Sequence, residues 1–407
     1  MLSIGLTGGI AAGKSLVAHR LVELGAVLID ADRLAREVVA PGTEGLEEIR
    51  KIFGAEVFAA DGSLDRARLG TLIFADQKLR EQLNAIVHPR VRSRAAELSA
   101  QAASDAVVVQ DIPLLAETGQ GAKFHLVIVV DAAEDLRRRR LIERRGLSEQ
   151  AARERITAQA SREQRLAVAD VVLENNGAEQ ELLLRVEALW KERLLPFAAN
   201  LARGARAQRN GPAMLFPADP SWPAQAQRLA NRILAATGER GIGVDHIGST
   251  AVPGLEAKDV IDLQLRVRSL GVADDLAPTL AAAGFPGLPD ISRDTPKSFD
   301  PEPEHWRKRF HANADPGRPV NLHVRVEGSA GANYALAFRD WLRADPKIRA
   351  EYLAEKRRVA AAHASDVSTA GYAEAKEPWF TEAAELALEA WKTRSGWQPP
   401  RVDFGKA

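Results

Sequence analysis

One eight-residue segment near the N-terminus constrains the fold more than any other part of the chain. Residues 8–15 fit the spacing G-x-x-x-x-G-K-[ST] and lie between an apolar run at Leu2–Leu6 and a helical pattern at Ser15–Leu24. Glycines let the backbone curl around phosphate oxygens, and the start of the following helix directs free N–H groups at the anion. The segment therefore predicts a phosphate-binding loop between a strand and a helix.

The chemistry of this loop predicts ATP and Mg²⁺ as cofactors. Lys14 would bridge the β- and γ-phosphates, and the Ser15 hydroxyl would bind the metal ion. The alternative is a chance glycine-rich turn, which the strand and helix on either side argue against. The residues expected to contact the nucleotide here are Gly8, Gly9, Ile10, Ala11, Ala12, Gly13, Lys14, Ser15 and Leu16.

Apolar runs alternate with longer helical patterns through the first half of the chain. This alternation is typical of an α/β domain in which helices cover a parallel sheet. The expected strands are Leu2–Leu6, Ala26–Ile29, Ala106–Val109, Leu126–Val130 and Val171–Leu173.

The length of 407 residues exceeds what one hydrophobic core usually serves, so we expect more than one domain. An amphipathic helix from Glu179 to about Leu195 is expected to end before Pro196. We predict a first domain at residues 1–200, a linker at 201–214 and a second domain at 215–407. The second domain is richer in aromatic residues and prolines, and Val260–Val267 resembles a strand.

The composition narrows the classes of partner. Lys+Arg and Asp+Glu both number 55, so the overall charge gives no reason to expect nucleic acid as the main partner. The absence of cysteine excludes disulfides and thiolate chemistry and fits a reducing compartment.

No basic leader and no apolar run of the ~20 residues that span a bilayer are present, so we expect a cytoplasmic protein without a membrane partner. The oligomeric state stays open.

Two acids follow the second predicted strand. Asp30 and Asp32 would lie at the carboxyl edge of the sheet, beside the phosphate-binding loop. Of the two, Asp32 is the better candidate for the base that orients an acceptor hydroxyl and takes its proton, while Asp30 would help to hold a metal or the loop. The alternative is that both acids only cap the helix that starts near Arg33.

A dense group of arginines follows the fourth strand, at Arg137–Arg140, Arg144 and Arg145. Like charges at this density repel one another unless an anion compensates them, as in a lid that closes over ATP. We expect Arg140 to face inward. A nucleic-acid patch or a plain solvated helix face remains an alternative. The apolar run Val107–Val109, followed by Asp111, resembles the strand and acid of a mechanical ATPase. Pro113 follows at once, which weakens the case for such a motor, and we assign Asp111 no catalytic role.

Residues 1 to about 195 resemble the dephospho-CoA kinase family over their whole length. The family's order is matched by GLTGGIAAGKS, LIDADRLAREVVAPG, LNAIVHPRVR, DIPLLAETG and ITAQASREQRLAVADVVLENNG. The resemblance implies a P-loop fold with a helical substrate domain and a lid. It also implies phosphorylation of the ribose 3′-hydroxyl of dephospho-CoA by ATP, the last step of coenzyme A synthesis.

The resemblance also implies roles for single residues. It places the base at Asp32, the acceptor region at His88, and lid or nucleotide contacts at Arg140, Arg144 and Asn175. Another small-molecule or nucleoside kinase, or a nucleotide-switched regulatory or chaperone-like protein, stays open as an alternative, because spacing alone does not name the acceptor.

Residues 215 to 395 resemble the GrpB-like branch of the nucleotidyltransferase superfamily. The matching segments are DHIGSTAVPGLEAKDVID, NLHVRV, FRDWLRADPKIRAEYLAEKRRVAAAH and YAEAKEPWF. The resemblance implies an α+β fold with a phosphate-gripping Gly248-Ser249 turn. Asp262 is followed by Gln264 where a second metal-binding acid would be expected, and an amide cannot supply that charge. We therefore expect a folding, stabilising or regulatory role in place of catalysis.

Overall fold

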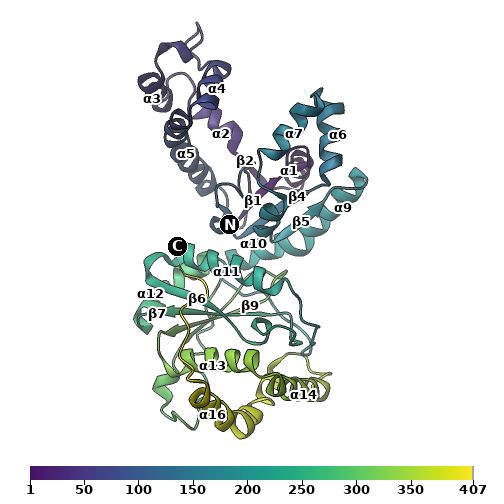
Figure 1. The fold of residues 1–407 in the computed structure, drawn as a ribbon, viewed down its shortest axis with the longest axis vertical. Coiled ribbons are helices and arrows are strands. Elements are labelled where there is room, and N and C mark those ends of the chain that lie inside the picture. Colours follow the sequence, from purple (N-terminus) through teal and green to yellow (C-terminus); the bar gives the residue numbers. More distant parts are fainter. Residues whose placement is uncertain (406–407) are drawn as a thin grey trace. The chain divides into compact units, whose positions relative to one another are not determined.

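The computed structural model describes residues 1–405 (Figure 1). Contacts divide the chain into two compact units. The first consists of Met1–Gln120 and Leu126–Trp190, and the second of Gly121–His125 and Lys191–Ala407. Within the described residues no helix has both the length and the apolar character that a membrane span requires.

The first unit is built on a five-stranded parallel sheet in the order β2-β3-β1-β4-β5. All five predicted strands are confirmed. The inner strands β1, β3 and β4 are buried apolar runs, as is typical of parallel strands covered on both faces, whereas β2 and β5 are short edge strands. Their carboxyl ends meet at one edge of the sheet, which is where the predicted site residues begin. The strands are β1 Leu2–Gly8, β2 Val27–Asp30, β3 Val107–Asp111, β4 Leu126–Asp131 and β5 Val171–Glu174.

Two helical groups of the first unit project beyond its sheet in Figure 1, one formed by α3–α5 and the other by α6 and α7. The first group has a small apolar core of its own, which includes Leu46, Ile49 and Phe53. The predicted fold class, a P-loop sheet with a helical region and a lid region, is confirmed. The helices are α1 Lys14–Glu23, α2 Ala31–Glu37, α3 Glu44–Phe53, α4 Arg66–Ala75, α5 Gln77–Ala100, α6 Glu134–Arg145, α7 Glu149–Thr157, α8 Arg162–Ala167 and α9 Glu179–Leu189.

The expected helix end before Pro196 is wrong. After α9, a π-helical turn at Trp190–Leu194 leads into α10 (Leu195–Ala202), which contains Pro196 in its first turn. A proline in the first turn of a helix costs little, because the N–H that it lacks would have no partner there. Residues 203–214, within the expected linker, form no helix, and Ala207 N–H donates to Asn313 O at 3.0 Å.

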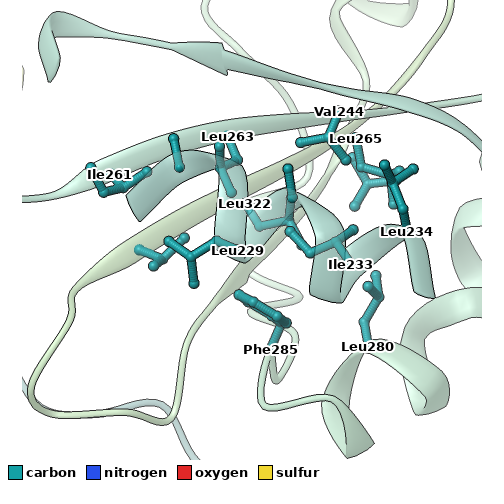
Figure 2. Close-up of a cluster of buried hydrophobic side chains, with 14 of the residues drawn as sticks. Leu229, Ile233, Leu234, Val244, Ile261, Leu263, Leu265, Leu280, Phe285 and Leu322 are labelled. Atoms are coloured by element: carbon teal, nitrogen blue, oxygen red, sulfur yellow. The ribbon is translucent and has the colours of Figure 1, made fainter. Parts of the chain in front are cut away.

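The second unit has a four-stranded mixed sheet in the order β6-β7-β9-β8. The β7–β9 pair is parallel and the other two pairs are antiparallel, as expected for an α+β domain. Figure 2 shows the core on one face, where Ile233, Leu263 and Phe285 are among the buried side chains. The strands are β6 Gly241–Ile247, β7 Ile261–Val267, β8 Arg309–Ala312 and β9 Val320–Val326.

Helices cover both faces of this second sheet (Figure 1). The helices α11 and α12 pack on the core of Figure 2, while α13, α14 and α16 contribute to a second, aromatic-rich cluster that includes Trp341, Tyr352 and Trp391. The helices are α11 Trp222–Thr237, α12 Leu270–Ala282, α13 Ala330–Ala344, α14 Pro346–Ala362, α15 Ala370–Glu374 and α16 Glu385–Ser395.

Candidate active site

The loop between β1 and α1 has the tight backbone that its glycines predict. Gly13 has φ 101° at the N-cap of α1, and a Cβ there would lie 2.2 Å from Asn175 Nδ2. A Cβ at Gly9 would lie 2.3 Å from Arg137 Nη1. Ala11 adopts φ 60°, which is unusual for a residue with a side chain. The α1 N-terminus carries no side-chain cap and no acidic residue in its first turn, so its positive end is available to an anion.

Lys14 forms an ion pair with the Asp111 carboxylate at the end of β3. Burial raises the pKa of Asp111, Lys14 opposes this shift, and the Asp30 and Asp32 carboxylates add to it by repulsion. Asp111 is therefore part of the site, although the sequence analysis gave it no catalytic role. The apolar run Val107–Val109 before an acid was the signal, and β-sheet pairing of Asp30 with Asp111 brings the acids together.

Asp30 and Asp32 have different roles in the structure. The Asp30 carboxylate caps α2 by accepting from Asp32 N–H at 2.9 Å and Arg33 N–H at 3.0 Å. The capping alternative thus holds for Asp30. Asp32 lies in the first turn of α2 with an exposed side chain, and nothing within residues 1–405 pairs with its carboxylate. Of these two acids, Asp32 is therefore the one whose carboxylate has no partner in the described part of the chain.

Arg140 and Asn175 brace the loop through its carbonyl oxygens. Arg140 Nη1 donates to Ala11 O at 3.2 Å, Arg140 Nη2 donates to Asn175 O at 3.2 Å, and Asn175 Nδ2 donates to Ala12 O at 2.7 Å. Both predicted residues are thus brought to the loop.

Two other predicted residues make no contact with the loop in the part of the chain that is described. The Arg144 side chain on α6 is exposed, although a nucleotide contact was expected of it. His88, expected in the acceptor region and not at the loop, lies exposed on α5 in the first helical group.

Two further arginines lie against the loop. The sequence analysis named Arg137 only as part of the arginine group, and it did not name Arg165. Arg137 and Arg165 are each 4% exposed, and a Cβ at Gly9 would approach both guanidinium groups. Among the described residues, Nε and Nη1 of Arg137 and Nε of Arg165 have no hydrogen-bond partner. Burial, and then repulsion by Arg165, lower the pKa of Arg137. Buried cations without a carboxylate fit an anion such as the phosphates of ATP.

Within the described residues, no group of three or more His, Asp or Glu side chains is arranged to hold a metal ion.

The Gly248-Ser249 turn of the second unit lies beside Asp262, as its resemblance implies, but the next inward position lacks an acid. Gln264 is fully buried, its Nε2 donates to Asp245 Oδ2 at 3.2 Å, and its Oε1 accepts from Arg325 Nη1 at 2.7 Å. Both ends of the amide are therefore already bonded within the protein.

Comparisons with known proteins agree with the two units. The family model "Dephospho-CoA kinase" matches residues 2–181, and the model "GrpB protein" matches residues 212–385. Dephospho-CoA kinases of Mycobacterium tuberculosis and Mycolicibacterium paratuberculosis are each 50% identical over 412 residues, which cover 98% of this chain and all of each relative. The Streptomyces avermitilis dephospho-CoA kinase is 56% identical over 192 residues, which are 47% of this chain and 94% of that relative.

Solved structures match each region separately. TT1252 from Thermus thermophilus is 36% identical and covers 47% of this chain and 97% of its own, with a TM-score of 0.42. GrpB from Enterococcus faecalis is 24% identical, and the match covers 44% of this chain and 99% of the Enterococcus chain, with a TM-score of 0.37. Because the whole-length relatives include both regions, the chain belongs to the dephospho-CoA kinase family, in a form that carries a GrpB-like region after the kinase region.

Proposed function

We propose that the chain transfers the γ-phosphate of ATP to the ribose 3′-hydroxyl of dephospho-CoA, which gives coenzyme A and ADP. The observation that carries this proposal is the placement of Arg137 and Arg165 against a phosphate-binding loop that also carries Lys14. Both arginines are buried, and neither forms an ion pair with a carboxylate in the described part of the chain. The names of the whole-length relatives supply the acceptor.

The loop and the arginines bind and neutralise the triphosphate. The N–H groups of the loop and Lys14 hold the β- and γ-phosphates, while the arginine guanidinium groups balance charge that develops on the transferring group. Mg²⁺ held at Ser15 would shield the β- and γ-phosphate oxygens. Asn175 and Arg140 keep the loop carbonyls turned away from the anion.

Asp32 acts on the acceptor. A bond forms between the acceptor oxygen and the γ-phosphorus, the bond to the β–γ bridging oxygen breaks, and the acceptor proton passes to Asp32 as ADP leaves. Asp30 is committed to the α2 cap and Asp111 to Lys14, so Asp32 is the acid with a free carboxylate.

The test replaces Asp32 with Asn and measures ADP release in the presence of dephospho-CoA, adenosine or AMP. We expect a decrease in kcat of about 10²–10⁴-fold while ATP binding is retained. Asp105→Asn is the matched control, because this exposed acid precedes β3 at the opposite edge of the sheet. Normal turnover by Asp32→Asn would refute the mechanism.

We propose that residues 1–200 act as the kinase domain and that residues 215–407 have a folding, stabilising or regulatory role without nucleotidyl transfer. The bonded amide of Gln264 supports the absence of nucleotidyl transfer. The expected result is no pyrophosphate release from ATP above background in either the parent chain or Asp262→Asn. Release that depends on Asp262 would reassign the second domain as an enzyme.

A further inference from the structure

The segment that follows β3, residues 112–120, borders both the acceptor edge of the sheet and the phosphate-binding loop. β3 lies between β2, which leads to Asp32, and β1, which leads to the loop. Ile112 N–H donates to Leu6 O at 2.9 Å, so the segment starts against β1. An acceptor held between Asp32 and the terminal phosphate would therefore lie over the start of this segment, which we call the β3 segment.

Glu117 links the β3 segment to the turn between α7 and α8. Its Oε1 accepts from Ala160 N–H at 2.8 Å. The turn is short, since α7 ends at Thr157 and α8 begins at Arg162. A carboxylate makes a stronger hydrogen bond to a backbone N–H than a neutral acceptor does, so Glu117 fixes the position of this turn.

The backbone that Glu117 holds also positions one of the two buried arginines at the loop. Ala160 O accepts from Arg165 Nη1. A Cβ at Gly9 would lie 3.3 Å from Arg165 Cζ, so the guanidinium group lies against the loop. A displacement of the Ala160 backbone would therefore displace the Arg165 guanidinium from the loop.

The residue before Ala160 reaches the loop itself. Gln159 Oε1 accepts from Ile10 N–H at 2.7 Å. The Ile10 side chain also packs on a small apolar cluster of α6 and α7 that includes Leu141 and Ile156. The position of this part of the loop thus depends on the turn between α7 and α8.

The Glu117 side chain is exposed, which separates its effect on position from an effect on folding. Water competes for an exposed hydrogen bond, so this bond adds little to the stability of the fold. Its geometry still determines where the turn lies, and catalytic groups lose activity when they shift by a fraction of an ångström to an ångström.

We propose that Glu117 is a positioning residue for phosphoryl transfer, which couples the β3 segment to Arg165 and Ile10 through the turn between α7 and α8. This inference rests on the proposed function, because it assigns the loop to ATP and the neighbouring edge of the sheet to the acceptor. Glu117 acts through these groups and not by contact with ATP. An acceptor that orders the β3 segment would thereby also order the groups that hold ATP.

A double-mutant cycle on the full chain tests this path without any acceptor. The Kd of ADP is measured by calorimetry for the parent chain, Glu117→Ala, Gln159→Ala and the double variant. Each single substitution should weaken ADP binding by about three- to tenfold, because one hydrogen bond of the path is lost. The double variant should be no weaker than the weaker-binding single variant, because both bonds act along one path.

Two results of the cycle would overturn the proposal. One is an unchanged ADP affinity in Glu117→Ala. The other is a pair of losses that multiply in the double variant, because contacts that act independently have additive free energies.

A conservative variant and a matched control identify the accepting oxygen as the cause. Glu117→Gln keeps an oxygen that can accept from Ala160 N–H and should restore the ADP affinity to within about twofold of the parent chain. Glu154→Ala is the control, because this exposed glutamate lies on α7 and accepts from Gln150 Nε2 at 2.7 Å within the same helix. Equal losses in Glu117→Ala and Glu117→Gln, or in Glu117→Ala and Glu154→Ala, would contradict the assigned path.

The same titration with dephospho-CoA present measures the coupling to the acceptor. In the parent chain dephospho-CoA should tighten ADP binding several-fold, and Glu117→Ala should lose most of that tightening. Bound dephospho-CoA that leaves the ADP affinity of the parent chain unchanged, or tightening that persists in Glu117→Ala, would overturn the coupling. A parent chain that does not bind dephospho-CoA would instead refute the proposed acceptor, while the cycle without acceptor still decides the role of Glu117.

Discussion

Arg137 carries a buried charge that no carboxylate of the described residues balances, so its burial is best explained by a bound anion. It is 4% exposed, two of its guanidinium nitrogens have no partner among the described residues, and its neighbour Arg165 carries the same charge. Two buried like charges without a balancing anion destabilise the folded protein. Such destabilising arrangements occur mainly at catalytic and binding sites.

The substitution Arg137→Met should therefore separate stability from activity. Methionine fills a similar volume without the charge, so we expect the free energy of unfolding without ligand to rise by about 1 kcal/mol. The same change should lower kcat/KM by about 10²–10³-fold, because a group that balances the transferring phosphate is lost. Arg139→Met, on the exposed face of α6, is the control for both measurements. A stable variant with full activity would remove Arg137 from the mechanism.

Lys356 predicts a pH dependence of stability in the second unit. Its folded pKa of about 7 lies below the ordinary lysine value, so between about pH 7 and 10 the unfolded chain holds a proton that the folded chain lacks. Raising the pH from 7 to 9.5 should therefore stabilise α14, by up to about 3 kcal/mol. Hydrogen exchange in α14 measures this. Lys356→Met should show a smaller increase, and part of the increase should remain because burial also lowers the pKa of Lys258, to about 8. A parent chain that loses stability over this range, relative to the variant, would contradict the lowered pKa of Lys356.

At the level of elements, strands were easier to predict than the site that they build. Buried parallel strands are continuous apolar runs, and the phosphate-binding loop is a local pattern, so both could be predicted from the sequence. The Lys14–Asp111 pair depends on β3 lying between β2 and β1, which no local pattern encodes. The position of Arg137 and Arg165 against Gly9 likewise depends on how α6 and α8 pack on the loop. The helix through Pro196 was missed because a π turn places the proline in a new first turn.

The position of Asp32 depends on the cap that Asp30 forms at the start of α2. Asp30→Ala removes the cap and should destabilise the helix by about 1 kcal/mol, which displaces Asp32 and lowers kcat with little change in ATP affinity. Asp30→Ser keeps a capping oxygen and should restore most of kcat. Asp65→Ala is the matched control, because Asp65 caps α4 with the same pair of backbone bonds. Equal kcat in Asp30→Ala and the parent chain would show that the cap does not position the base.

At the level of the whole molecule, the chain combines a kinase region with a second region that relatives of the same length also contain. The Streptomyces avermitilis relative matches only the first region over 94% of its own length, so the kinase region also occurs without the second.

The most direct test of the central claim is the position of the phosphate in the product. The full chain is incubated with ATP and dephospho-CoA, and the products are analysed by ³¹P NMR and mass spectrometry. The account predicts one ADP for each coenzyme A formed, with the new phosphate on the ribose 3′-oxygen. ADP that accumulates with inorganic phosphate, while dephospho-CoA is unchanged, would contradict it.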